Sequence, residues 1–272
     1  MSAKLYDKPL LFYILSTIIP WLFWFTAAYF SYSLPDNKIW ISSTIGFIGL
    51  LSPFIIAVVM ISDNEARYQD FIHRFFNIRG IKPRYILITC FLMLASILLA
   101  QLISLAFGYS VNQFHISGHY TFTSGVFPVW FLLIIAPLVE ELAWHSYGTD
   151  TLRQRFSLFK TSLIFALFWG LWHIPLSFIK GYYHSNLVQS GAIYSANFLV
   201  SLFPFVLIMN WLYYKSNRNI IIPVIFHISA GYFNEIFDTH PMSKVIQTGL
   251  LLLFSIYIIT KDKPFFFKYK IK

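Results

Sequence analysis

Long apolar segments occupy most of this chain and decide what it can fold into. A helix that crosses a bilayer needs about 20 mostly apolar residues, and eight segments of the 272-residue chain meet that condition. They are roughly residues 9–33, 39–62, 85–107, 126–148, 160–180, 194–214, 219–237 and 244–260. The sequence therefore predicts an all-α fold, a polytopic membrane helix bundle of about eight transmembrane helices in one integral domain.

The overall composition excludes an ordinary soluble domain. Hydrophobic residues make up 57% of the chain and charged residues only 11%, whereas a soluble domain carries about 25% charged residues. The segment 9–33 exceeds the 7–15-residue core of a signal peptide, so we expect it to be retained as the first crossing. The single cysteine, Cys90, forms neither an intrachain disulfide nor a thiolate cluster.

The basic residues are distributed unequally between the two sides of the predicted bundle. With eight crossings, the side that holds both termini carries 17 of the 20 Lys and Arg residues, and the other side carries Lys38, Lys180 and Lys244. Positive residues gather in cytoplasmic loops. We therefore predict a multi-pass protein of the cell membrane with both termini in the cytoplasm. This distribution also accounts for the net charge of +9 without a nucleic-acid partner.

Two of the predicted cytoplasmic segments have features of a membrane surface. In the loop 63–84, apolar residues at Tyr68, Phe71, Phe75 and Ile78 recur with helical spacing, which predicts a short amphipathic helix on the membrane. The tail 261–272 alternates lysines with aromatic residues. Such a basic, aromatic segment is suited to anionic headgroups.

Two adjacent carboxylates near the end of the fourth apolar segment are the first candidate for chemistry. Ionisable residues inside a membrane span are costly and usually functional. Glu140 and Glu141 point in different directions on a helix, and Glu141 shares a face with His145, four residues later. The alternative is an acid pair at a helix end that faces cytoplasmic water.

Two further segments contribute histidines. Trp169 precedes His173 by four residues, a spacing that packs the indole against the imidazole. His227 lies inside the seventh segment, with Asn234 two turns further on. Taken alone, either histidine can be a core residue satisfied by a backbone partner.

The expected depths of these residues in the membrane are similar enough for the three segments to form one site. At 1.5 Å per residue, Glu140 lies roughly 12–15 Å, His173 roughly 20 Å and His227 roughly 12 Å from the cytoplasmic boundary. A glutamate with two histidines can activate water directly, or through a divalent metal such as zinc bound by His173 and His227. Neither HExxH nor GxSxG occurs, and Asp150 and Asp238 fall at the ends of crossings, which disfavours a di-aspartate protease.

The three segments resemble the motifs of a known family. Glu140-Glu141, Trp169 with His173, and His227 are similar in order and spacing to the EExxxR, WxxxH and HxxxN motifs of the CPBP intramembrane proteases. That family groups type II CAAX prenyl endopeptidases with Abi and bacteriocin-processing membrane proteins. The resemblance covers about 126–237 and implies a catalytic core there, between helices 1–3 in 1–125 and the last helix and basic tail in 238–272.

The resemblance implies an intramembrane endopeptidase and a role for each motif. Glu140 would activate the water, aided by His173, and His227 would stabilise the oxyanion. Glu141 would be the fourth catalytic residue. The supporting residues would be His145, Asn234 and Trp169. The substrate would be a membrane-associated or lipidated protein or peptide, prenylated in the CAAX members. Family members are called metalloproteases, but a metal-free glutamate mechanism is also argued, so the cofactor stays open.

Two positions depart from the family pattern. His145 stands where the first motif has arginine, and Gly231 stands where the third has asparagine or aspartate. Asn234 lies one turn further along the same helix. These departures favour, as the alternative, a non-catalytic relative that acts as an immunity or partner-binding membrane protein. A proton-coupled transporter is a third hypothesis, although the sequence lacks the internal repeats that transporters often show.

Overall fold

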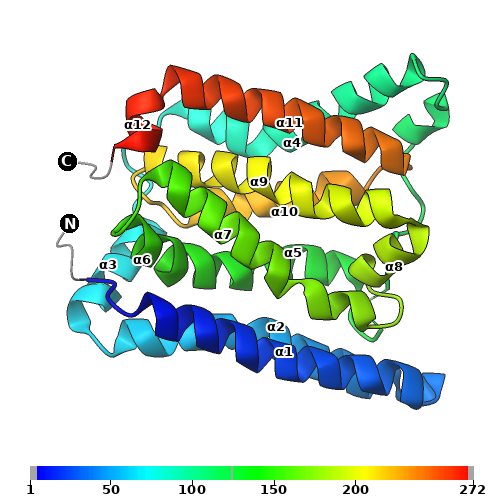
Figure 1. Ribbon diagram of the computed structural model, residues 1–272, viewed down its shortest axis with the longest axis horizontal. Coiled ribbons are helices and arrows are strands. Elements are labelled where there is room, and N and C mark those ends of the chain that lie inside the picture. The colour runs from blue at the N-terminus through cyan, green and yellow to red at the C-terminus, as the bar shows by residue number, and fades with distance from the viewer. Residues whose placement is uncertain (1–4, 124, 269–272) are drawn as a thin grey trace.

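The computed structural model describes residues 5–123 and 125–268, and the regular elements of these residues are helices that pack side by side into one bundle (Figure 1). One isolated antiparallel bridge, between Ile116 and Phe237, joins two of the connecting segments. The prediction of an all-α bundle is confirmed.

Seven helices of the described chain are long and apolar enough to cross a membrane. They are α1 (Pro9–Ser33), α2 (Ile39–Ser62), α4 (Pro83–Leu105), α5 (Val129–Ala143), which continues to Arg153, α7 (Leu158–Trp172), which continues to Phe178, α9 (Ala192–Lys215) and α11 (Pro241–Lys261). Each coincides with a predicted crossing to within a few residues, except that α5 begins later and continues further than 126–148. The protein is therefore a multi-pass membrane protein.

The eighth predicted crossing, 219–237, corresponds to a shorter helix, α10 (Ile221–Glu235). Its 15 residues span about 22 Å, less than the roughly 30 Å of a hydrocarbon core. The helix packs against α4, α5 and α9 inside the bundle, so the neighbouring helices and not lipid surround much of it. The described chain begins and ends at the same end of the bundle (Figure 1).

The predicted amphipathic helix in 63–84 is α3 (Glu65–Phe76), but its apolar and polar faces are not arranged as the spacing suggested. Arg67 and Arg74 point into the bundle and are only 6% and 2% exposed. Tyr68 and Ile78, two of the four residues on which the prediction rested, are exposed. The other two, Phe71 and Phe75, pack against the core as predicted. The inward face therefore carries arginines beside these aromatic rings, because acceptors inside the bundle can pair with the guanidinium groups.

Arg74 connects α3 to the distal part of the fourth crossing. There α5 continues as a π-helical turn, Trp144–Gly148, and then as α6 (Thr149–Arg153). The guanidinium donates to the backbone oxygens of His145 and Ser146, both at 2.8 Å, and to Asp150 Oδ2 at 2.9 Å. Burial alone would lower the pKa of Arg74, but Tyr213, Asp150 and other neighbours outweigh it and raise that pKa above its usual value. The cation is thus held in place beneath the π turn.

The basic tail is described as far as Lys268. α12 (Lys263–Phe267) turns back against the bundle and buries Phe266 completely. Residues 1–4 and 269–272, which include Lys4 and the last lysines of the predicted headgroup-binding tail, lie outside the described residues.

Replacing Arg74 tests whether this ion-pair network stabilises the bundle. We expect Arg74→Leu to lower the free energy of unfolding by about 1.5–3 kcal/mol, because it removes charge-assisted hydrogen bonds to buried acceptors while Arg218 stays paired with Asp150. Thermal unfolding of the purified protein in detergent micelles measures the change. Arg79→Leu is the matched control, since Arg79 is exposed. Equal melting temperatures for the two variants would contradict the expectation.

Candidate active site

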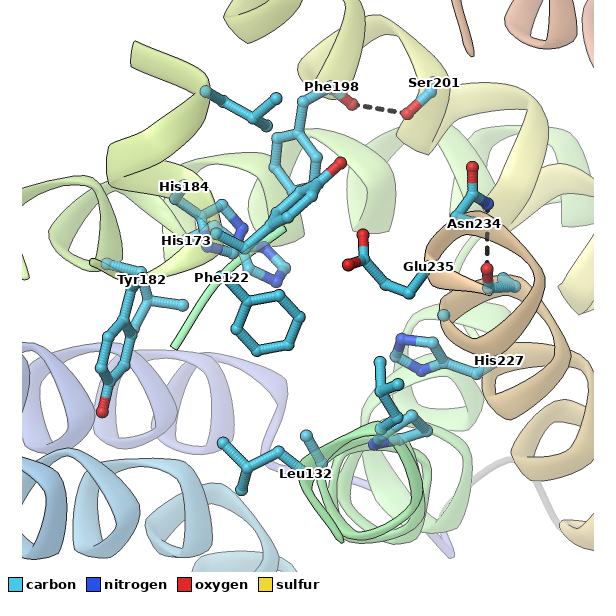
Figure 2. Close-up of a pocket in the computed structure, with 18 of the residues that line it drawn as sticks. Phe122, Leu132, His173, Tyr182, His184, Phe198, Ser201, His227, Asn234 and Glu235 are labelled. Carbon is cyan, nitrogen blue, oxygen red and sulfur yellow. Dashed lines mark hydrogen bonds between the residues drawn. The ribbon is translucent and has the colours of Figure 1, made fainter. Parts of the chain in front are cut away.

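A cavity of about 370 Å³ lies between the helices, and five of the predicted site residues line it: Glu140, Trp169, His173, His227 and Asn234. Figure 2 shows His173, His227 and Asn234 around this cavity. The cavity extends from the middle of the bundle to α8 (Tyr183–Ser190) and the segment 122–123. Those elements lie at the end of the bundle opposite the chain ends (Figure 1). Most of the other lining side chains are apolar, so the polar groups stand in an apolar wall.

Glu140 is a buried carboxylate in this wall. It follows Pro137, whose ring removes one backbone donor from α5. Its Oε2 accepts a hydrogen bond from Trp169 Nε1 at 3.0 Å and a longer one from Trp144 Nε1 at 3.5 Å. Both indoles bind the same oxygen, and no described residue donates to Oε1. This leaves Oε1 available to a water molecule or a substrate.

Glu141 is completely buried and does not line the cavity. Its Oε1 accepts from His227 Nδ1 at 2.8 Å, and its Oε2 is in close contact with His145 Nδ1. The predicted pairing of Glu141 with His145 on one helix face is therefore present. Because Glu141 lies behind His227, it can orient that imidazole but does not itself face the cavity.

His145 is held by a second polar pair that the sequence analysis did not identify. Its Nε2 lies 3.0 Å from Asn210 Oδ1, and Asn210 Nδ2 donates to Ser162 Oγ at 2.9 Å. Both ring nitrogens of His145 thus lie next to oxygen atoms of neighbouring side chains, and these contacts fix the orientation of the ring. An amide inside the apolar segment 194–214 was a signal that could have pointed to Asn210.

His173 is oriented by the backbone of its own helix. Its Nδ1 lies 2.6 Å from the carbonyl oxygen of Trp169, so Nδ1 carries the proton and Nε2 is an acceptor. The indole of Trp169 packs against the imidazole, with ring centroids 5.3 Å apart, as the spacing predicted.

His184 is a further lining residue that the sequence analysis missed. It lies in α8, between two crossings, and its ring stacks on His173 with centroids 5.0 Å apart (Figure 2). Burial, with a smaller contribution from His173, holds the pKa of His184 well below its usual value, so the ring is neutral. No spacing in the sequence relates His184 to His173, because they meet only through the fold.

The third motif has glycine at the position where the family pattern has asparagine or aspartate, so the cavity lacks that side chain. Gly231 lines the cavity, and a Cβ built there would lie 3.4 Å from Leu133 Cδ2, so a side chain fits. Asn234 lines the cavity too, but its Nδ2 donates to the carbonyl oxygen of Ala230 at 2.9 Å. Asn234 therefore does not replace the missing group at position 231.

The described residues do not fit a metal centre with three protein ligands. They contain no group of three or more His, Cys, Asp or Glu side chains placed to hold one ion. His173 and His227 each contact a protein oxygen through Nδ1, as metal-binding imidazoles usually do, and each keeps Nε2 toward the cavity. Catalytic zinc has three protein ligands in its usual sites. Since the described side chains are not placed to supply three, the geometry fits direct activation of water by Glu140.

A carboxylate in a cavity wall, beside one imidazole with a free Nε2 and another held by a second carboxylate, defines a membrane-embedded acid–base hydrolase. Residues 121–233 match the family model of the Rce1-like type II CAAX prenyl endopeptidases. The chain is also 38% identical over 263 residues to CAAX prenyl protease 2 of Methanococcus maripaludis, and the match covers 96% of each chain. The chain belongs to the type II CAAX prenyl endopeptidase family.

The family assignment confirms two predictions made from the sequence. The resemblance to CAAX-type membrane proteases is correct, and the activity is that of an intramembrane endopeptidase. The substrate is accordingly a protein in the membrane.

Replacing Trp169 tests whether its indole positions Glu140. We expect Trp169→Phe to lower kcat about 10- to 100-fold, because it removes a hydrogen bond to a charged group. Steady-state cleavage of a lipidated peptide measures the change. Trp211→Phe is the matched control, since it removes an indole hydrogen bond of 2.9 Å to Asp262, remote from the cavity. If both variants lost the same fraction of kcat, the effect would be structural.

Proposed function

We propose that this chain hydrolyses a peptide bond of a lipidated membrane protein substrate and that Glu140 activates the attacking water. The observation that carries the proposal is the placement of Glu140, a buried carboxylate in the cavity wall with one oxygen bound by two indoles and the other left available. Buried carboxylates of this kind serve as general bases.

The neighbouring residues support a sequence of steps. Glu140 accepts a proton from a water molecule whose position is fixed by Nε2 of His173. The oxygen of that water adds to the carbonyl carbon of the substrate. His227, whose Nδ1 donates to Glu141, acts in this step as the doubly protonated imidazolium, and its Nε2–H donates to the oxyanion. Glu140 then passes the proton to the leaving amine, and the peptide bond breaks.

The proposed substrate carries a prenylated CAAX sequence at its C-terminus. The name of the archaeal relative refers to this motif, in which a lipidated cysteine is followed by two aliphatic residues and a last residue of variable type. The apolar part of the wall, which includes Phe127, Leu132 and Leu133, suits a prenyl chain and aliphatic side chains.

We further propose that both termini face the cytoplasm. The unequal count of Lys and Arg, 17 against 3, supports this orientation, and so does the position of the described chain ends at one end of the bundle (Figure 1). In this orientation the cavity runs from the middle of the bundle toward the outer face.

Replacing Glu140 tests the function. We expect Glu140→Gln to reduce cleavage by 10²–10⁴-fold, the usual contribution of a general base, while the protein still inserts. Comparing newly formed peptide termini in membranes of cells with equal amounts of wild type and variant measures the effect. Glu65→Gln, on the exposed face of α3, is the control. Identical profiles for Glu140→Gln and wild type would instead favour the non-catalytic, partner-binding alternative.

Position 231 offers a gain-of-activity test. We expect Gly231→Asn to raise kcat by up to about 10²-fold, because an amide there adds a donor to the oxyanion. Gly231→Ala adds a Cβ without a donor and should leave kcat near that of the wild type. Single-turnover cleavage of a lipidated peptide separates the two, and equal rates for both variants would remove position 231 from the oxyanion site.

A further inference from the structure

A charged pair stands at the outer end of the cavity, away from the residues of the proposed mechanism. Glu235 is the last residue of α10, and Lys244 lies in the first turn of α11. Both line the cavity, and Lys244 is the one lysine or arginine among the described lining residues. Figure 2 shows Glu235 projecting into the space between His184 and His227.

Glu235 is held firmly by a neighbour other than Lys244. Its Oε2 accepts from the backbone nitrogen of Thr121 at 3.0 Å and from Thr121 Oγ1 at 2.8 Å. These bonds fasten the segment before α5 to the end of α10. The carboxylate therefore keeps its position whether or not the lysine contacts it.

Lys244 is held more loosely. Its Nζ lies 3.6 Å from Glu235 Oε1, beyond hydrogen-bond length, and 5.8 Å from the ring centre of Tyr183. The side chain is 16% exposed. An ammonium group has three donors, and here none makes a hydrogen bond to a described residue. A simple structural ion pair would close this gap, because a partly buried cation gains most from direct hydrogen bonds.

The distance from the proposed oxyanion site to this pair matches a short peptide. Glu235 follows His227 by eight residues on the same helix, which is about 12 Å along its axis. Three extended residues span about 10–11 Å. In a CAAX sequence three residues follow the cysteine, so a bond cleaved directly after that cysteine lies one such length from the terminal carboxylate.

The wall between the two points leaves room for a peptide. Ala230 and Gly231 line the cavity between His227 and Glu235, and both side chains are small or absent. A substrate backbone can therefore lie alongside α10, with its aliphatic side chains against the apolar residues opposite.

We propose that Lys244 binds the C-terminal carboxylate of the substrate and that Glu235 is the residue that positions Lys244. The peptidase would then recognise the free end of the chain and cut at a fixed distance from it. This inference rests on the proposed cleavage of CAAX-type substrates and adds the residue that determines where cleavage occurs.

The test compares two prenylated peptides of the same sequence, one with a free C-terminal carboxylate and one with a C-terminal amide. We expect the wild type to cleave the acid with a kcat/KM about 10- to 100-fold higher, mainly through a lower KM, because the amide lacks the charge that the ammonium binds. Lys244→Met should reduce cleavage of the acid to the level of the amide. Lys244→Arg should retain part of the preference.

The matched control is Lys180→Met, which removes an exposed lysine at the same end of the bundle but outside this cavity. It should leave both peptides unaffected. Glu235→Gln should reduce the preference for the acid several-fold, since Lys244 loses the carboxylate that positions it, while the amide oxygen of glutamine still accepts from Thr121.

The outcomes separate this inference from the proposed function. If the wild type cleaved both peptides equally, in a reaction that Glu140→Gln abolishes, carboxylate binding by Lys244 would be overturned and the peptidase would stand. A preference that survived in Lys244→Met would likewise overturn it. If neither peptide were cleaved in a Glu140-dependent way, the proposed substrate class would fail, and this inference with it.

Discussion

The site depends on a carboxylate that never faces the cavity. Glu141 binds His227 of α10 with one oxygen and His145 with the other, and Asn210 and Ser162 continue this chain of contacts to α9 and α7. Four helices are thereby joined by polar contacts inside the bundle, where an unpaired polar group costs several kcal/mol. The orientation of His227 is consequently a property of the whole core and not of its own helix.

A second buried polar network, formed around Arg74, supports the site from the end of the bundle where the described chain ends lie. The π turn Trp144–Gly148 interrupts the α-helical hydrogen bonding just after the two glutamates, and Arg74 donates to two of its carbonyl oxygens. Arg74 belongs to a helix outside the crossings, so the surface helix α3 and the site are mechanically linked. This explains why the inward face of α3 carries arginines although its spacing suggested an apolar one.

The parts of this structure that the sequence predicted are those that depend on local geometry. The lengths of the apolar segments predicted the membrane crossings. The four-residue spacing predicted the contacts of Glu141 with His145 and of Trp169 with His173. The missed residues meet only through tertiary packing. His184 lies in a connecting helix, and Glu235 and Lys244 come together because α10 and α11 turn at the end of the cavity. A single sequence contains no spacing that brings such residues to one place.

The glycine at position 231 has two opposite physical consequences. The wall next to His227 lacks a donor, and an oxyanion donor can be worth 10²–10³ in rate. The lack of a side chain at position 231 also keeps the cavity open between His227 and Glu235, where a peptide backbone would have to lie close to α10. Since a Cβ at this position would already approach Leu133 to 3.4 Å, a longer side chain occupies space that a substrate could use. Activity at this site therefore reflects a balance between stabilising the transition state and admitting the chain that is to be cut.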